Sequence, residues 1–75
     1  MALATMVVVN ETTGDKVRRV RDDLMLSQRE LAAEAGISPA TLNNIENNNI
    51  KRPHPSTVRK IAAALGVEPR DLRAD

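Results

Sequence analysis

Residues 26–47, LSQRELAAEAGISPATLNNIEN, contain the signals that decide the fold. Ser27 and Glu30 have the spacing of a capping box, which starts a helix. Gly36 follows at a position where a helix favours a left-handed C-terminal residue. Ser38 then offers a second N-cap, and the proline after it suits the first turn of another helix. The stretch therefore predicts two short helices joined by a three-residue turn, which is a helix-turn-helix arrangement.

Helical spacing extends to both sides of this pair. Upstream, Val17, Val20 and Leu24 fall at i, i+3 and i+7 and give one apolar face. Downstream, a further apolar face closed by Gly66 predicts another helix, and Glu68 opens a last short helical turn. The expected fold is all-α, with helices over about residues 14–25, 28–35, 39–47, 55–65 and 68–72.

The composition excludes several classes of protein. The chain has 75 residues, enough for one small domain, and no Cys, Phe, Tyr or Trp. Without cysteine there is no disulfide or thiolate zinc site, and a single histidine cannot build a His-rich metal site. No Ser/His/Asp set or glycine-rich phosphate loop can be assembled, so neither an enzyme nor a cofactor is expected. No apolar run is long enough to span a membrane and no signal peptide is evident, which predicts a cytoplasmic protein.

The first 13 residues differ from the rest of the chain. They contain a β-branched apolar run without helical spacing and without Lys or Arg. This pattern predicts a strand or ordered arm, residues 1–13, in front of a domain at residues 14–75. A lone strand needs a partner for its edge. We therefore expect the arm to pair two chains through Met6, Val7, Val8 and Val9.

Charge is unevenly distributed along the chain. The formal net charge is +1, but residues 37–60 carry four cations and one anion, and each flanking segment has one excess anion. A local basic stretch is a better sign of an anionic partner than the total charge. For four charges alone, a solvated surface is the simpler interpretation.

These motifs occur together in one known family. Residues 14–72 resemble the helix-turn-helix domain of lambdoid phage repressors and Cro proteins, the XRE family. The segments that match in order and spacing are Leu26-Ser27-Gln28, Glu30-Leu31-Ala32, Ala35-Gly36-Ile37-Ser38, Ile45-Glu46-Asn47 and Ala63-Ala64-Leu65-Gly66-Val67. The resemblance implies a compact five-helix fold and a sequence-specific regulator that binds double-stranded DNA as a dimer at the nucleoid. Repression is the favoured outcome.

The resemblance also implies roles for individual residues. In this motif class the second helix, here residues 39–47, enters the major groove with its N-terminal part. Base contacts are expected from Ala40, Thr41, Asn43 and Asn44. Contacts to the DNA backbone, or orientation of the helix on the DNA, are expected from Gln28, Ser38, Asn47, Lys51, Arg52 and His54. A polar face turned to solvent remains the alternative for the asparagines.

Arg21 and Glu46 are expected to have a structural role. Both lie beside apolar faces, and in the family the matching positions form a partly buried ion pair between the second helix of the motif and the first helix of the bundle.

An alternative function is also open, namely an antitoxin-like or protein-interaction module that uses the N-terminal arm, with DNA binding secondary. Failure to bind any duplex at low salt would favour that alternative.

Overall fold

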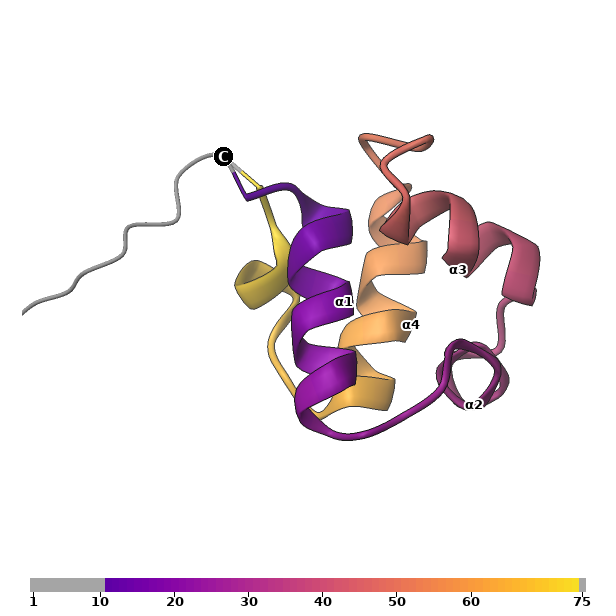
Figure 1. The fold of residues 1–75 in the computed structure, drawn as a ribbon. Coiled ribbons are helices and arrows are strands. Elements are labelled where there is room, and N and C mark those ends of the chain that lie inside the picture. The colour runs from indigo at the N-terminus through magenta and orange to yellow at the C-terminus, as the bar shows by residue number, and fades with distance from the viewer. Residues whose placement is uncertain (1–10, 75) are drawn as a thin grey trace, which may run out of the picture.

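The computed structural model describes residues 11–74. In this part of the chain the elements are four α-helices and one 3-10 turn (Figure 1): α1 (Thr13–Asp23), α2 (Gln28–Ala35), α3 (Pro39–Glu46), α4 (Pro55–Leu65) and η1 (Pro69–Leu72). The prediction of a fifth helix is therefore wrong, because the last element is a 3-10 turn. It is a 3-10 turn because four residues that begin with a proline are too short for an α-helix and close through i to i+3 bonds.

The N-terminal arm is expected at residues 1–13, most of which precede the described part of the chain. Its pairing residues, Met6 to Val9, lie outside the described residues, and residues 11–74 contain no strand.

Local caps fix most helix ends at the expected places. Ser27 and Glu30 form a capping box, and the side chain of Ser38 accepts a hydrogen bond from the backbone N–H of Thr41. Gly36 and Gly66 end α2 and α4 with φ angles of 72° and 75°. These ends are local in sequence, which is why spacing alone predicts them.

The end of α1 differs from the expectation. The helix stops at Asp23, and Met25 takes a left-handed conformation with a φ of 58°. The N–H groups of Met25 and Leu26 bond to the carbonyl groups of Asp22 and Arg21, which is a Schellman motif. Leu24, expected on the buried face, is therefore the C-cap and remains 50% exposed.

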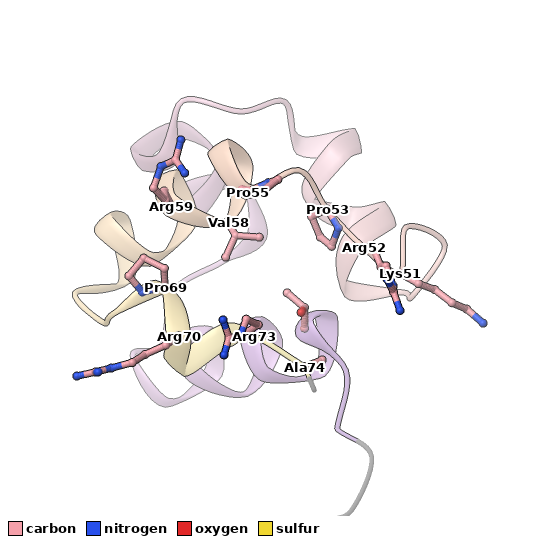
Figure 2. A pocket seen from close by; sticks show the side chains of 11 residues that line it. Lys51, Arg52, Pro53, Pro55, Val58, Arg59, Pro69, Arg70, Arg73 and Ala74 are labelled. Atoms are coloured by element: carbon pink, nitrogen blue, oxygen red, sulfur yellow. The ribbon is translucent and has the colours of Figure 1, made fainter.

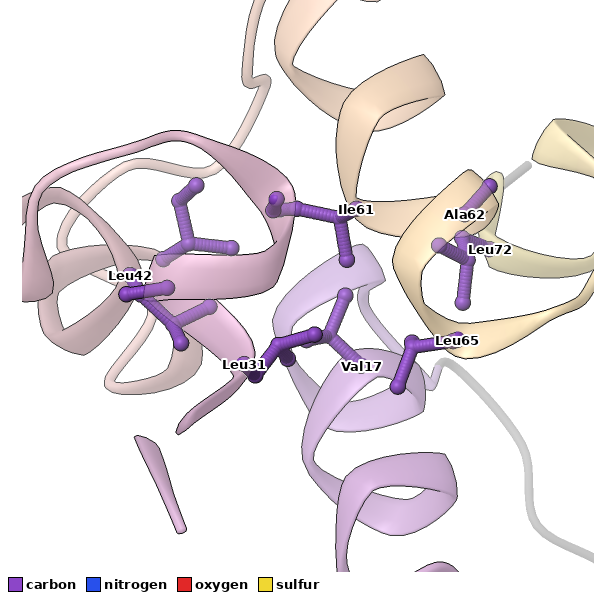
Figure 3. Close-up of a cluster of buried hydrophobic side chains, with 10 residues drawn as sticks. Val17, Leu31, Leu42, Ile61, Ala62, Leu65 and Leu72 are labelled. Atoms are coloured by element: carbon purple, nitrogen blue, oxygen red, sulfur yellow. The ribbon is translucent and has the colours of Figure 1, made fainter. Parts of the chain in front are cut away.

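An aliphatic core holds the helices together. In Figure 1, α2 and α3 lie on one side of the neighbouring helices α1 and α4, and η1 lies on the other. Every element contributes to one cluster, of which Figure 3 labels a part; its buried members are Val17, Leu31, Ala32, Ala35, Leu42, Ile45, Ile61, Ala62, Leu65 and Leu72.

The start of α1 holds the end of α3 at close range. Gly14 is buried there, and a Cβ atom at this position would overlap the backbone carbonyl oxygen of Ile45. Asn48 follows α3 with a φ of 65°, and its side chain accepts a hydrogen bond from Thr12 (2.6 Å) and donates one to Asp15 (3.2 Å). Backbone packing and side-chain bonds thus fix the orientation of α3 relative to α1.

Candidate nucleic-acid interface

α3 presents a polar side to solvent. Leu42 and Ile45 are fully buried, whereas Ala40, Asn43 and Asn47 on the other side are exposed. The spacing of these residues follows the 3.6-residue period of the helix. The exposed side is therefore free to meet a partner while the buried side holds the helix in the core.

Beneath this surface lies a buried ion pair. Arg21 of α1 donates two hydrogen bonds to the carboxylate of Glu46 in α3, at 2.8 and 2.9 Å, and a third to the carbonyl oxygen of Leu26 at 2.7 Å. The side chains of Arg21 and Glu46 are 12% and 1% exposed. The hydrogen bond to Glu46 raises the pKa of Arg21, although burial opposes the rise. The pair joins α1, α3 and the connection between α1 and α2.

A chain of amide side chains extends from this ion pair to the surface. The Nε2 atom of Gln28 donates to Glu46 (3.0 Å), and the Oε1 atom of Gln28 accepts from Asn43 (3.1 Å). The Oδ1 atom of Asn43 in turn accepts from Asn47 (2.9 Å). Because an ionised carboxylate only accepts hydrogen bonds, Glu46 fixes the direction of every amide in the chain. Asn43 retains one N–H and one oxygen lone pair that these two bonds do not use.

The other expected base-contacting residues have separate partners. Asn44 is half-buried, and its side-chain oxygen accepts from Asn49 (3.3 Å). Thr41 accepts from the hydroxyl of Ser38 (2.9 Å), which also caps the helix. Ala40 is exposed at the first turn. The structure thus links Gln28 to two of the asparagines and leaves Asn44 outside that chain.

The loop after α3 carries the expected cations. Lys51, Arg52 and His54 are exposed, and none of them makes a hydrogen bond or ion pair through its side chain with residues 11–74. They lie in the loop that joins α3 to α4, and they give this loop a positive charge.

Spacing could not predict the amide chain. Gln28 and Asn43 are 15 residues apart and belong to different helices, so no local period relates them. The sequence does place an acid, Glu46, beside the apolar face of α3, and an amide, Gln28, at the start of α2. A buried carboxylate requires hydrogen-bond donors.

Residues 11–74 were searched for a membrane-spanning helix and for a metal-binding group. No helix there is long and apolar enough to cross a membrane. The same residues contain no group of three or more His, Asp and Glu side chains placed to hold a metal ion.

Comparison with known families agrees with the geometry. The sequence model of the helix-turn-helix family matches residues 17–72, most of the chain. The chain belongs to this family, the XRE type. This XRE protein shares 39% identity over 61 residues with an uncharacterised helix-turn-helix transcriptional regulator, RghRB, and 35% over 57 residues with the transcriptional repressor RghR, both from Bacillus subtilis. The matches cover 81% and 76% of this chain but only 44% and 42% of the relatives, so the chain spans less than half of their length.

The fold also matches a solved structure. SinR of Bacillus subtilis, the master regulator of biofilm formation, has been solved in complex with DNA. That structure superposes with a TM-score of 0.78 at 30% identity and covers 81% of this chain and 97% of its own.

Proposed function

We propose that this XRE protein is a sequence-specific regulator, a repressor, that binds double-stranded DNA by placing α3 in the major groove. The observation that carries the proposal is the hydrogen-bonded chain from Glu46 through Gln28 to Asn43 and Asn47 on the exposed side of α3. It orders base-reading groups before any ligand is present. Ordering in advance reduces the conformational cost of binding.

The free hydrogen-bonding groups of Asn43 suit adenine. A side-chain amide pairs with the N7 and N6 groups of adenine by donating one hydrogen bond and accepting one. Asn43 keeps one donor and one acceptor after its bonds to Gln28 and Asn47. Asn44 supplies a second amide, and Ala40 and Thr41 offer methyl groups to thymine. Sequence preference in this proposal centres on adenine and thymine.

Phosphate contacts position the helix on the duplex. Lys51 and Arg52 supply the charge, and His54 supplies a donor from the same loop. Ser38, Asn47 and Gln28 contribute hydrogen bonds or orient α3. The similarity to SinR, which has been solved in complex with DNA, supports this docking mode.

The dimer and the repressor role are further parts of the proposal. Two copies paired through Met6 to Val9 would place two recognition helices on successive major grooves, about 34 Å apart. The relative named as a repressor, RghR, supports repression by occupation of a promoter. Light scattering and gel shifts of V7S/V8S/V9S in the full chain test the pairing: if the mass and the stepwise DNA binding equal those of the wild type, the arm does not pair the chains.

In-vitro selection from random duplexes tests the core of the proposal. We expect the selected duplexes to share a half-site rich in A·T pairs. In gel shifts, N43A should weaken binding to this half-site by about 1–3 kcal/mol and alter the base preference at one position. Lys60→Ala, on the surface of α4, is the matched control and leaves the preference unchanged. If no duplex is enriched or bound at low salt, the proposal is wrong and a protein-interaction module is favoured.

A further inference from the structure

A basic groove lies between η1 and the loop that joins α3 to α4. Its volume is about 750 Å³, and it runs between the start of α1, the loop before α4, and η1. Figure 2 shows Arg59 and Arg70 on one side of it and Lys51 and Arg52 on the other. Apolar side chains also line the groove, namely Pro53, Pro55, Val58 and Pro69.

The lining combines positive charge with an apolar floor. Lys51, Arg52, Arg59, Arg70 and Arg73 belong to it, and no Asp or Glu does. Nearby acids are used elsewhere: Asp15 accepts from the N–H of Thr12, and Asp71 accepts from the N–H of Glu68.

Most of these cations have no partner in the described chain. Lys51, Arg52, Arg59 and Arg70 make no hydrogen bond or ion pair through their side chains with residues 11–74. The cations at the rim of the groove attract an anionic partner, and the apolar lining residues favour one that also carries apolar side chains.

Residues 22–25 lie at the opposite end of α1 and are called the tip segment. They depart from three local preferences. Asp22 and Asp23 lie in the last turn of α1, where the helix dipole disfavours negative charge. Leu24 and Met25 are 50% and 89% exposed, and they are the only large exposed hydrophobic residues in the described chain. Met25 also has a left-handed backbone that glycine would adopt without strain. Local rules are most often broken where a surface has a function.

We infer that the tip segment of one copy docks into the basic groove of a second copy. The two surfaces are complementary: the carboxylate of Asp23 meets Arg59 and Arg70, and the exposed side chains of Leu24 and Met25 meet the apolar lining of the groove. Asp22 already pairs with Arg21 at 3.4 Å. The tip segment cannot reach the groove of its own copy. Thr13 of the groove and Asp23 of the tip are the first and last residues of α1, about 15 Å apart at 1.5 Å rise per residue. The contact is head-to-tail, and copies on neighbouring DNA sites would therefore associate in a row.

Complementation between two variants in solution, followed by NMR, tests the docking without DNA. The tip variant is D23N/M25G, in which loss of the acid and the added glycine both suit the end of a helix, so its melting temperature should rise. Its neutral tip is also not complementary to a groove that carries glutamates. The groove variant is R59E/R70E, and its matched control R29E/K60E changes the charge equally at exposed positions that do not line the groove. Circular dichroism first establishes that all variants are folded.

The wild type and the control should show concentration-dependent amide shifts at both surfaces, and either variant alone should not. When the labelled tip variant receives the unlabelled groove variant at low salt, shifts should return only in the groove. Raising the salt from about 20 mM to about 500 mM, which shortens the Debye length from about 21 Å to about 4 Å, should reduce these shifts at least about fivefold.

Other results overturn the inference. An absence of shifts in the mixture at about 1 mM protein, where weak contacts of small interfaces are still populated, would exclude the contact. Shifts that survive in both single variants, or that map to residues 6–9, would assign self-association to another surface. Shifts at Arg59 and Arg70 that appear only on addition of a DNA duplex would make nucleic acid the occupant of the groove. None of these results bears on whether α3 reads DNA.

Discussion

Glu46 shows how one buried charge organises a polar surface. Its side chain is 1% exposed, so its ionised form requires several donors, and Arg21 and Gln28 supply three hydrogen bonds. The same bonds determine which end of the Gln28 amide faces Asn43. A residue that contacts no ligand thereby sets the groups that α3 presents.

Replacement of Arg21 by alanine should destabilise the fold strongly. The change leaves Glu46 buried without its charge partner, and removal of one member of such a pair costs about 3–5 kcal/mol. Lys16→Ala is the comparison, because Lys16 of the same helix makes one exposed hydrogen bond to the carbonyl of Arg73. Urea unfolding measures both variants. Equal midpoints would show that the Arg21–Glu46 pair does not stabilise the protein.

At the scale of the elements, the contact between α1 and α3 determines how the reading helix sits. α1 begins with a capping box in which Thr12 and Asp15 bond to each other's backbone, and Asn48 after α3 bonds to both side chains. Gly14 lets the two backbones touch. Positions that support helix formation elsewhere serve here to join two helices.

Gly14→Ala should lower stability although alanine is the better helix former. At an exposed helical site this change stabilises by about 1 kcal/mol, but here the methyl group would overlap the carbonyl oxygen of Ile45. Overpacking of this kind costs about 1–3 kcal/mol. Arg18→Ala, on the exposed side of α1, is the control and should change the melting temperature little. A more stable Gly14→Ala variant would mean that α1 can move away from α3 without loss.

Acid should weaken the same contact. Hydrogen bonds from the backbone of Thr12 and then from Asn48 lower the pKa of Asp15 below its ordinary value of 3.8. Because the folded state favours the ionised form, this stabilisation is complete above about pH 4 and is lost as the pH falls through the lowered value. The pKa of Glu30 is lowered in the same way by Ser27.

In unfolding measured from pH 7 down to about pH 2, the loss of stability should be shallower for Asp15→Asn than for the wild type. Glu34→Gln, at an exposed acid of α2 that makes no hydrogen bond or ion pair through its side chain with residues 11–74, is the control. A profile for Asp15→Asn that is as steep as the wild-type profile would contradict the role of this carboxylate.

The whole molecule shows what the sequence could predict. Caps such as Ser27 and Gly36 act within one turn, so spacing located α2 and α3 to within a residue. Spacing puts Leu24 on the buried face of the first helix. The structure differs because α1 ends at a left-handed Met25, and methionine is not a residue type that predicts a left-handed conformation. The polar stripe of α3 follows from helical period, whereas the bonds of Gln28 to Asn43 and of Asn44 to Asn49 depend on how helices pack. Spacing therefore predicted the elements, whereas the one tertiary pair that was expected, Arg21 with Glu46, came from the family resemblance.

The charge distribution of the whole molecule leads to the last prediction. The net charge is only +1, so affinity for DNA should depend on few phosphate contacts and fall moderately with salt. Each neutralised phosphate contributes about −0.9 to the slope of log K against log salt. K51A/R52A should therefore make the slope shallower by about 1.8 for each chain on a selected duplex, because it removes two phosphate contacts.

Base-reading changes should behave differently. N43A/N44A should weaken binding to the selected duplex and leave the salt slope unchanged, because neutral amides release no counterions. Lys60→Ala, an exposed cation of α4 away from the loop, should change neither quantity. Fluorescence anisotropy between about 50 and 200 mM salt gives all three slopes. If K51A/R52A keeps the wild-type slope, the loop after α3 does not contact the phosphates, and the duplex must lie further toward the N-terminal end of α3.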